Sequence, residues 1–526
     1  MKTIRGQLVD VFRKETYPAQ VDFDSKIRRV ARLESAPKVF ICPGFVDAHV
    51  HTESSMLIPS EFARLALRHG TVAVVADPHE IANVLGIKGV EWMIRDAKGS
   101  RLKFCFGASP CVPATRFETA GAKLGPREIG KLLRKKEVYH LSEVMNYPGV
   151  VAGDPDMIAK ISLAKKAGKP VDGHCPGLSG EMLRRYVSAG IQTDHECSTL
   201  GEAREKAKLG MKILVREGSA AKNLGNLHPI LEEGGHMLCG DDTHPDDLLS
   251  GHMDRILRKC VALGVDPLTA VASCTKNTVE HYGIPAGLLR EGDSADFVLL
   301  GDLMNFRVKE TWVGGKRVFP GKARARKAKR PVNSFFARAL GPADFAFAEK
   351  GRVPVIGAID GEIVTEKLHA DAAGLPDTRR DILKIAVINR YENARPAIGF
   401  IKNFGLGKGA LGSSVMHDSH NIGVVGADDE SMCRVANEIM RMRGGLAVFD
   451  GKRMLSLPLP FAGLMSGEKG EAVAKKYKGL SALAGRMGCR LKSPFMTLSF
   501  MGLLVIPHLK ISDRGMFDAD KFEFVR

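Results

Sequence analysis

Short apolar runs alternate with longer amphipathic stretches from about residue 39 to residue 240. Each run has the length of a strand, and the stretch after it is long enough for one helix, which is the pattern of repeated βα units. The runs end near eight residues, namely His49, Ala76, Ala108, Glu143, His174, His195, Val215 and Gly240. Eight βα units within about 250 residues predict an α/β protein with a (β/α)₈ barrel of the TIM type.

A doubly wound open sheet is the competing architecture for the same alternation. Polar residues stand at many of the predicted strand ends, where a barrel builds its active site. An open sheet gives no reason for polar residues to gather at so many strand ends. The pattern therefore favours a barrel, which we expect over residues 43–285.

The regions on either side of the barrel have a different pattern. Residues 1–42 and 286–325 contain short apolar runs separated by turns, and we expect them to form one small β domain from both flanks of the barrel. Residues 335–526 combine apolar runs with Gly-rich turns and predict an additional C-terminal α+β domain. Several domains are expected in 526 residues, because a single core stops growing at about 250–300 residues.

Composition is that of a globular protein, with 44% hydrophobic and 26% charged residues. Apolar runs stay well short of the roughly 20 residues that a membrane helix needs, so no membrane partner is expected. The N-terminal residues show no apolar signal region. Ten cysteines without a Cys-x-x-Cys pair fit free thiols in a reducing compartment. These features together predict a cytoplasmic protein.

The formal charge of +17 raises the alternative of a nucleic-acid-binding protein. Eight of the fifteen residues from Lys316 to Arg330 are Lys or Arg, and Pro331 follows them. Such a run beside Pro and Gly is typical of a solvated linker, which we expect over residues 316–334. Nucleic-acid binding would need aromatic residues among the basic ones on a folded face, whereas only 6% of all residues are aromatic. No nucleic-acid partner is therefore expected.

The strongest chemical signal is the pair His49 and His51 on the first predicted strand. Residues two apart on a strand point to the same face, which in a barrel can be the interior. A His-x-His pair alone is only moderately specific, because two packed or solvated histidines are also common. What strengthens the signal is that further imidazoles and carboxylates end other predicted strands: Glu143, His174, His195, Asp241 and Asp242.

Buried ionisable groups without partners are costly, so a packing role does not explain this set. Imidazoles and carboxylates suit zinc, iron or manganese, and a carboxylate can bridge two such ions. Bound metal lowers the pKa of water toward neutrality, and a nearby carboxylate can relay the proton. Asp241 is our choice for that carboxylate because it is the first one beyond the eighth predicted strand. The residues thus predict a two-metal hydrolase.

The same residues resemble the amidohydrolase superfamily, and more closely its bacterial and archaeal adenine deaminase family. The opening His-Val-His-Thr-Glu-Ser-Ser at 49–55 carries the resemblance most clearly. It continues through residues 76–84, 173–179, 214–219, 239–246, 414–421 and 457–466, and so spans most of the chain. The resemblance implies hydrolytic deamination of adenine to hypoxanthine and ammonia, as in purine salvage, and we expect a homo-oligomer.

The resemblance also implies a ligand set. His49 and His51 would bind the first of two divalent ions, and the second would be bound by His174 and His195. Glu143 would bridge them in place of the carbamylated lysine of many superfamily members. Asp241 would contact metal and shuttle protons, with Asp242 as the alternative aspartate. Manganese or iron is expected, with zinc as the alternative.

Further residues are candidates for substrate binding: His79, Glu80, Glu53, Arg216, Glu217 and Ser219. His79 and Glu80 would contact a substrate edge or an extra metal, although Glu80 also suits the start of a helix. Glu53 would face the site or cap the next segment.

His417 and His420 have a helical spacing that can bind metal, but we expect them to be structural histidines. An amidohydrolase acting on another nucleobase or a cyclic amide would share the metal site. Such an enzyme is not expected to carry the segment around these two histidines, which gives a means of distinguishing the alternatives.

Overall fold

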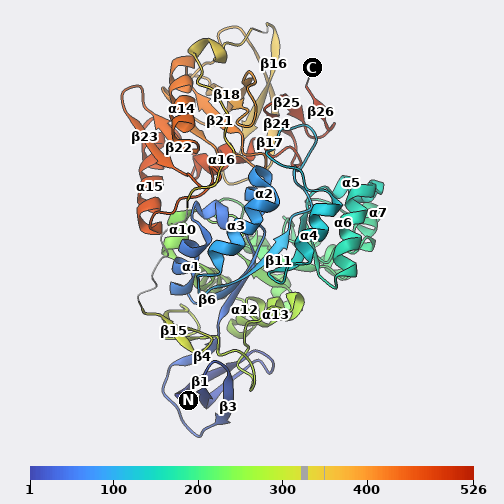
Figure 1. Cartoon of the computed structure of the whole chain (residues 1–526), viewed down its shortest axis with the longest axis vertical. Helices are drawn as coiled ribbons and strands as arrows, with labels where there is room; N and C mark the ends of the chain where they lie inside the picture. The colour runs from blue at the N-terminus through green and yellow to red at the C-terminus, as the bar shows by residue number, and fades with distance from the viewer. Residues whose placement is uncertain (322–329, 349, 526) are drawn as a thin grey trace.

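A computed structural model describes residues 1–321, 330–348 and 350–525 of the chain. Three regions follow one another along the long axis of the molecule (Figure 1). A small β domain lies at the N-terminal end, a barrel lies in the middle, and the C-terminal domain lies at the other end. No helix in these ranges is long and apolar enough to cross a membrane.

Eight parallel strands form the barrel, and their bounds are β5 (Phe45–Val50), β6 (Thr71–Ala76), β7 (Lys103–Ala108), β8 (Val138–Val144), β9 (Val171–Gly173), β10 (Thr193–Asp194), β11 (Lys212–Arg216) and β12 (Met237–Cys239). Strands β5 to β9 pair in order, as do β10 to β12. Two backbone bonds join these groups: Gln192 N donates to Val171 O at 2.9 Å, and Asp241 N donates to His49 O at 2.9 Å. The predicted barrel is confirmed, and each strand ends within a residue of its predicted end.

Helices follow the barrel strands: α1 (Pro59–Arg68), α2 (His79–Leu85), α3 (Ile87–Ala97), α4 (Pro126–Leu133), α5 (Tyr147–Ala152), α6 (Pro155–Lys166), α7 (Gly180–Ser188), α8 (Leu200–Lys208), α9 (Leu224–Leu227), α10 (Pro245–Ser250), α11 (Met253–Ala262), α12 (Pro267–Ser273) and α13 (Lys276–Tyr282). Local sequence explains where several begin. Asp154 caps α6 by accepting from Asp156 N at 2.8 Å, and Pro155 occupies the first helical position.

The small β domain is one seven-stranded sheet in the order β15-β14-β13-β4-β1-β2-β3. Its strands come from both flanks of the barrel, as predicted: β1 (Lys2–Asp10), β2 (Glu15–Phe23), β3 (Ile27–Arg32), β4 (Phe40–Pro43), β13 (Phe297–Leu300), β14 (Val308–Val313) and β15 (Lys316–Phe319). The first residues of the predicted basic linker therefore belong to β15, which pairs antiparallel with β14. Residues 322–329 of that linker lie outside the described residues.

The C-terminal domain is built on an eight-stranded sheet in the order β17-β16-β19-β18-β21-β20-β22-β23. Its strands are β16 (Arg352–Ala358), β17 (Thr365–Asp371), β18 (Ile382–Ile388), β19 (Ala397–Lys402), β20 (Ala410–Ser413), β21 (Ile422–Gly426), β22 (Gly445–Phe449) and β23 (Met454–Pro458). Helices α14 (Asp429–Met442), α15 (Gly470–Arg486) and α16 (Pro494–Phe500) accompany it, with a small sheet of β24 (Leu509–Ser512), β25 (Gly515–Asp518) and β26 (Glu523–Phe524).

The C-terminal domain lies at one end of the barrel (Figure 1). It contacts the loops that follow barrel strands β5 and β7. Ser466 N donates to Met56 O at 2.8 Å, and Asn421 Nδ2 donates to Thr119 O at 2.9 Å. Apolar residues of the two domains also share one buried core. Because these loops leave the carboxyl ends of the strands, the C-terminal domain covers the end of the barrel where active sites are built.

Candidate metal centre

His49 and His51 point from the end of β5 into one buried cluster. Their Nε2 atoms lie 3.0 Å apart, and both approach Asp241 Oδ1, at 3.6 and 3.2 Å. Asp241 follows β12 with a φ of 50°, in the left-handed region that a non-glycine residue rarely adopts. Backbone hydrogen bonds with the residues on both sides of Val50 hold Asp241 in this conformation. Asp241 N donates to His49 O, and His51 N donates to Asp241 O. This strained turn places the Asp241 carboxylate beside both imidazoles.

Glu143, at the end of β8, lies between two pairs of histidines. Its Oε1 faces His51 Nε2 at 3.3 Å and His49 Nε2 at 3.9 Å. Its Oε2 faces His174 Nδ1 at 2.7 Å and His195 Nε2 at 3.2 Å. One carboxylate oxygen is thus directed to each histidine pair, which is the arrangement of a bridging ligand.

The donor set fits two divalent ions. Metal–ligand distances of about 2.1 Å in a tetrahedral shell separate neighbouring ligand atoms by about 3.4 Å, close to the separations seen between these imidazoles and carboxylates. Four imidazoles and two carboxylates are ligands that zinc, iron and manganese accept. All six residues are at least 95% buried, so water contributes little to their solvation.

The surroundings of His49, Glu143 and Asp241 favour the forms that bind metal, whereas the neighbouring carboxylates raise the pKa values of His51 and His195 and favour their protonated forms. Burial and the neighbouring His195 and His51 lower the pKa of His49 to about 3, which leaves its imidazole neutral. Burial opposes ionisation of Glu143, but hydrogen bonds from His174, His195 and His79 hold its pKa well below the usual range. Burial likewise opposes ionisation of Asp241, and the hydrogen bond from His51 and the charge of Arg216 lower its pKa.

Arg216 lines the same cavity but is already paired with carboxylates. Its Nη2 donates to Glu196 Oε2 at 2.9 Å and its Nη1 to Asp241 Oδ2 at 3.0 Å. Glu196 also lies 3.3 Å from His195 Nε2. Sequence reasoning missed Glu196, although its place directly after a strand-end histidine was an available signal.

The structure places three of the other candidates away from the cavity. Glu217 pairs with Lys259 Nζ at 2.6 Å, and the Ser219 hydroxyl donates to Asp247 Oδ2 at 2.6 Å. Glu53 Oε1 accepts from Ile81 N at 3.3 Å, so it contacts the first turn of α2 and not the segment that follows it in the chain. Burial and the neighbouring Glu80 raise the pKa of Glu53 to about 7.

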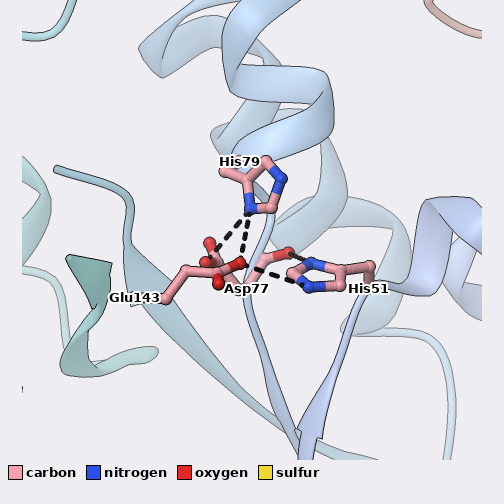
Figure 2. A group of neighbouring side chains, drawn as sticks. All are labelled: His51, Asp77, His79 and Glu143. Carbon is pink, nitrogen blue, oxygen red and sulfur yellow. Dashed lines mark hydrogen bonds and ion pairs between the residues drawn. The ribbon is translucent and has the colours of Figure 1, made fainter. Parts of the chain in front are cut away.

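His79 connects the centre to a second group of polar residues. Figure 2 shows its Nδ1 directed at Asp77 and Glu143, with His51 approaching Glu143 from the other side. Both distances from His79 Nδ1, to Asp77 Oδ2 and to Glu143 Oε1, are 3.2 Å. Asp77 follows β6 directly and was missed, although it carries the same strand-end signal as the predicted ligands.

Glu80 does not act as an ordinary exposed carboxylate at a helix start. Its side chain is buried between His417 and His420 of the C-terminal domain. Those two histidines were expected to be structural, and the structure brings both to the barrel.

The cavity beside the metal centre is lined by both domains. Its polar residues are His51, His79, Glu143, His174, His195, Glu196, Arg216, Asp241, Asp242, His417 and Asp418. Its apolar residues are Met145, Ala221, Ile363, Phe500 and Leu503, of which the last three come from the C-terminal domain. A lining that combines these polar groups with a few apolar side chains suits a small polar ligand.

Comparison with known proteins shows that two family models match the two large parts of the chain. The model of the Amidohydrolase family matches residues 40–318, and the model of the Adenine deaminase C-terminal domain matches residues 361–523. The chain is 49% identical to an adenine deaminase of Salinibacter ruber, over 99% of this chain and 98% of that protein. It is 47% identical to adenine deaminases of Sulfurovum sp. and Methanosarcina mazei, with at least 99% of both partners covered in each case.

Proposed function

The chain belongs to the adenine deaminase family of the amidohydrolases, and we propose that it hydrolyses adenine to hypoxanthine and ammonia. The observation that carries the proposal is the position of Glu143 between two histidine pairs, beside Asp241, in the lining of a cavity to which both domains contribute. An amidohydrolase with another nucleobase or cyclic amide as substrate would share the metal residues. The match of the C-terminal domain favours adenine over that alternative.

His49, His51 and Asp241 would hold one divalent ion in this proposal, and His174 and His195 the other, with Glu143 shared between them. When bound, such ions lower the pKa of water toward neutrality. Manganese or iron fits this set of ligands, with zinc as the alternative.

Asp241 is the group that would move the proton. Its carboxylate lines the cavity and is kept ionised by the hydrogen bond from His51 and by the charge of Arg216, so it can accept a proton from the attacking water. Attack forms a bond from the water oxygen to the C6 carbon of adenine, and the bond from C6 to the amino nitrogen then breaks. Asp241 returns its proton to the leaving nitrogen, which departs as ammonia. Glu196 would position Arg216, because its carboxylate accepts from the same guanidinium.

The apolar wall of the cavity would bind the faces of the purine. Phe500, Leu503 and Ile363 of the C-terminal domain line the cavity together with the polar residues of the barrel. Purine faces are apolar while their edges form hydrogen bonds, so this combination suits a free base. The preference for the base over its nucleoside follows the family.

A substrate panel tests the proposal. Manganese-loaded protein is incubated separately with adenine, adenosine, guanine, cytosine and dihydroorotate, and release of ammonia or ring opening is followed. We expect adenine to show the highest kcat/KM. Faster turnover of any other compound would contradict the assignment of adenine, while a metal-dependent hydrolase would remain.

A further inference from the structure

A second group of metal-binding side chains lies beside the candidate centre, between the two domains. Glu80 Oε1 lies 2.7 Å from His417 Nδ1 and 3.4 Å from His79 Nε2. Asp418 Oδ1 lies 3.5 Å from His79 Nε2 and 3.6 Å from His417 Nδ1. Two nitrogens and two oxygens thus gather within 4.8 Å of one another. These separations are close to the edge of about 3.4 Å that a tetrahedral ion with ligands at about 2.1 Å produces.

All four residues are buried, with exposures of 1% for Glu80, 2% for Asp418, 4% for His79 and 5% for His417. Within the described part of the chain, both oxygens of Glu80, Nε2 of His79 and Oδ2 of Asp418 have no hydrogen-bond partner. The short contact between Glu80 and His417 therefore lacks hydrogen-bond geometry. Ligands of a shared ion approach one another in this way, because each directs its lone pair at the ion and not at its neighbour.

The contacts of His79 point to the same conclusion. Its Nδ1 is hydrogen-bonded to the carboxylate oxygen Asp77 Oδ2 at 3.2 Å, and a carboxylate oxygen only accepts, so Nδ1 is the donor. Its Nε2 faces the carboxylates of Glu80 and Asp418. A cation between them would offset the negative charge of the two carboxylates. A histidine that donates one nitrogen to a carboxylate and binds metal with the other is a recurring arrangement in metal sites.

His420 supports the group without being a ligand. Its Nδ1 accepts from Met416 N at 3.3 Å, so Nε2 carries the proton and lies beside Glu80 Oε2. This contact has no hydrogen-bond geometry either, but the ring limits the space in which the Glu80 carboxylate can move.

We propose a third divalent-metal site at the junction of the two domains, formed by two histidines and two carboxylates: His79, Glu80, His417 and Asp418. Two imidazoles and two carboxylates suit a transition-metal ion such as Zn²⁺ in four-coordinate geometry. His79 and Glu80 belong to α2 of the barrel, whereas the other two ligands lie in the loop between β20 and β21. The ion therefore fastens the C-terminal domain to the barrel. It also fixes the cavity wall, because the His417 ring stacks on Phe500 with centroids 5.2 Å apart.

Metal content and anomalous diffraction test this site. Metal-free protein is saturated with Zn²⁺, freed of excess metal by gel filtration and analysed for zinc. We expect three ions per chain in the wild type and two in His417→Ala and in Asp418→Asn. His508→Ala is the matched control, since His508 forms a 2.7 Å pair with Asp520 elsewhere in the same domain, and it should keep three. His420→Ala should weaken binding of the third ion by about 10–100-fold.

The wild-type protein alone can overturn the proposal, even if the variants fail to fold. Crystals of the saturated protein, measured at the zinc edge, should show an anomalous peak within about 2.0–2.2 Å of Glu80 Oε1 and His417 Nδ1. Two ions per chain with no peak at this position would mean that the cluster is a network of imidazolium and carboxylate groups. Loss of an ion from His508→Ala would equally contradict a specific site.

Discussion

At the scale of single residues, Glu143 explains how two histidine pairs can serve one centre. Glu143 and Asp241 are the two acidic residues among the six predicted ligands. Of these two, Glu143 is the one whose two oxygens face different histidine pairs. Without the Glu143 carboxylate, the four imidazoles would lie close together and no shared negative charge would offset the charge of two ions. Residues such as Arg216 and Glu196 act one step further out, by holding Asp241 ionised and in place.

Replacement of this carboxylate by an amide tests the bridge. Glu143→Gln keeps the size of the side chain but removes the negative charge and one of the two oxygen donors. We expect both ions to bind more weakly and kcat/KM for adenine to fall at least about 100-fold, since even outer contacts of a metal site contribute about 10–100-fold. Elemental analysis and steady-state kinetics measure the two effects.

A buried glutamate outside the centre provides the control. Glu61 is 2% exposed and accepts a hydrogen bond from Gly470 N, which an amide oxygen can still accept. Glu61→Gln should therefore retain the metal content of the wild type. Normal metal content in Glu143→Gln would show that another residue bridges the ions.

At the scale of elements, the barrel strands and the segments of the C-terminal domain contribute different parts of the site. The strands place ligands at their carboxyl ends, where parallel pairing brings them together. The second domain supplies the cavity wall from α16 and from segments that precede β17 and follow α16. Lys510 on β24 connects these parts, because its Nζ donates to Ile363 O at 2.6 Å and to Phe500 O at 3.1 Å.

Burial of Lys510 predicts a pH dependence of stability. Burial lowers the pKa of this lysine from 10.5 to about 7. Below pH 7 both folded and unfolded chains carry the proton, and the buried charge costs stability. Between about pH 7 and 10.5 the unfolded chain binds more protons than the folded one, so this residue makes the free energy of unfolding rise with pH, by up to about 1.4 kcal/mol per unit. The neutral amine still has two N–H groups for its two carbonyl partners.

Lys510→Met should lack this contribution. Urea unfolding of both proteins at pH 7, 8 and 9 gives the difference between their free energies of unfolding. The contributions of titratable groups that both proteins contain cancel in this difference. We expect the wild type to gain stability relative to the variant as pH rises. A difference that does not change with pH would mean that Lys510 has an ordinary pKa in the folded protein.

At the scale of the whole molecule, the C-terminal domain completes the cavity that the barrel begins. Three of its apolar side chains line the cavity together with the predicted metal ligands, and the two domains share a buried core. The barrel by itself would leave this side of the cavity open to water.

Leu503→Ala tests the contribution of the second domain to substrate binding. Leu503 lines the cavity and is 6% exposed, so its removal takes apolar contact from the substrate. We expect KM for adenine to rise about tenfold with little change in kcat, since loss of such contact costs about 1–3 kcal/mol and acts on substrate and transition state alike. Leu455, which is 41% exposed on β23, provides the control, and Leu455→Ala should leave KM unchanged. Equal KM values for both variants would contradict a role for this wall.

The barrel and the residues at its strand ends follow from the amino-acid sequence alone. Strand-sized apolar runs followed by helical stretches specify βα units locally, and parallel pairing then gathers the polar residues after those runs at one end. The local pattern was therefore enough to predict that His49, Glu143, His174 and His195 meet. Alternation with period two also placed His49 and His51 on the same face.

Which loop side chains reach the cavity depends instead on the tertiary structure. Glu217 and Ser219 follow β11 just as Arg216 ends it, but Lys259 and Asp247 bind them elsewhere. His417 and Glu80 are far apart in the sequence and meet because the C-terminal domain docks on the barrel. Loop conformations and domain contacts depend on packing between distant segments, which local periodicity does not encode. The periodicity that predicted the strand ends therefore could not predict which residues meet between the domains.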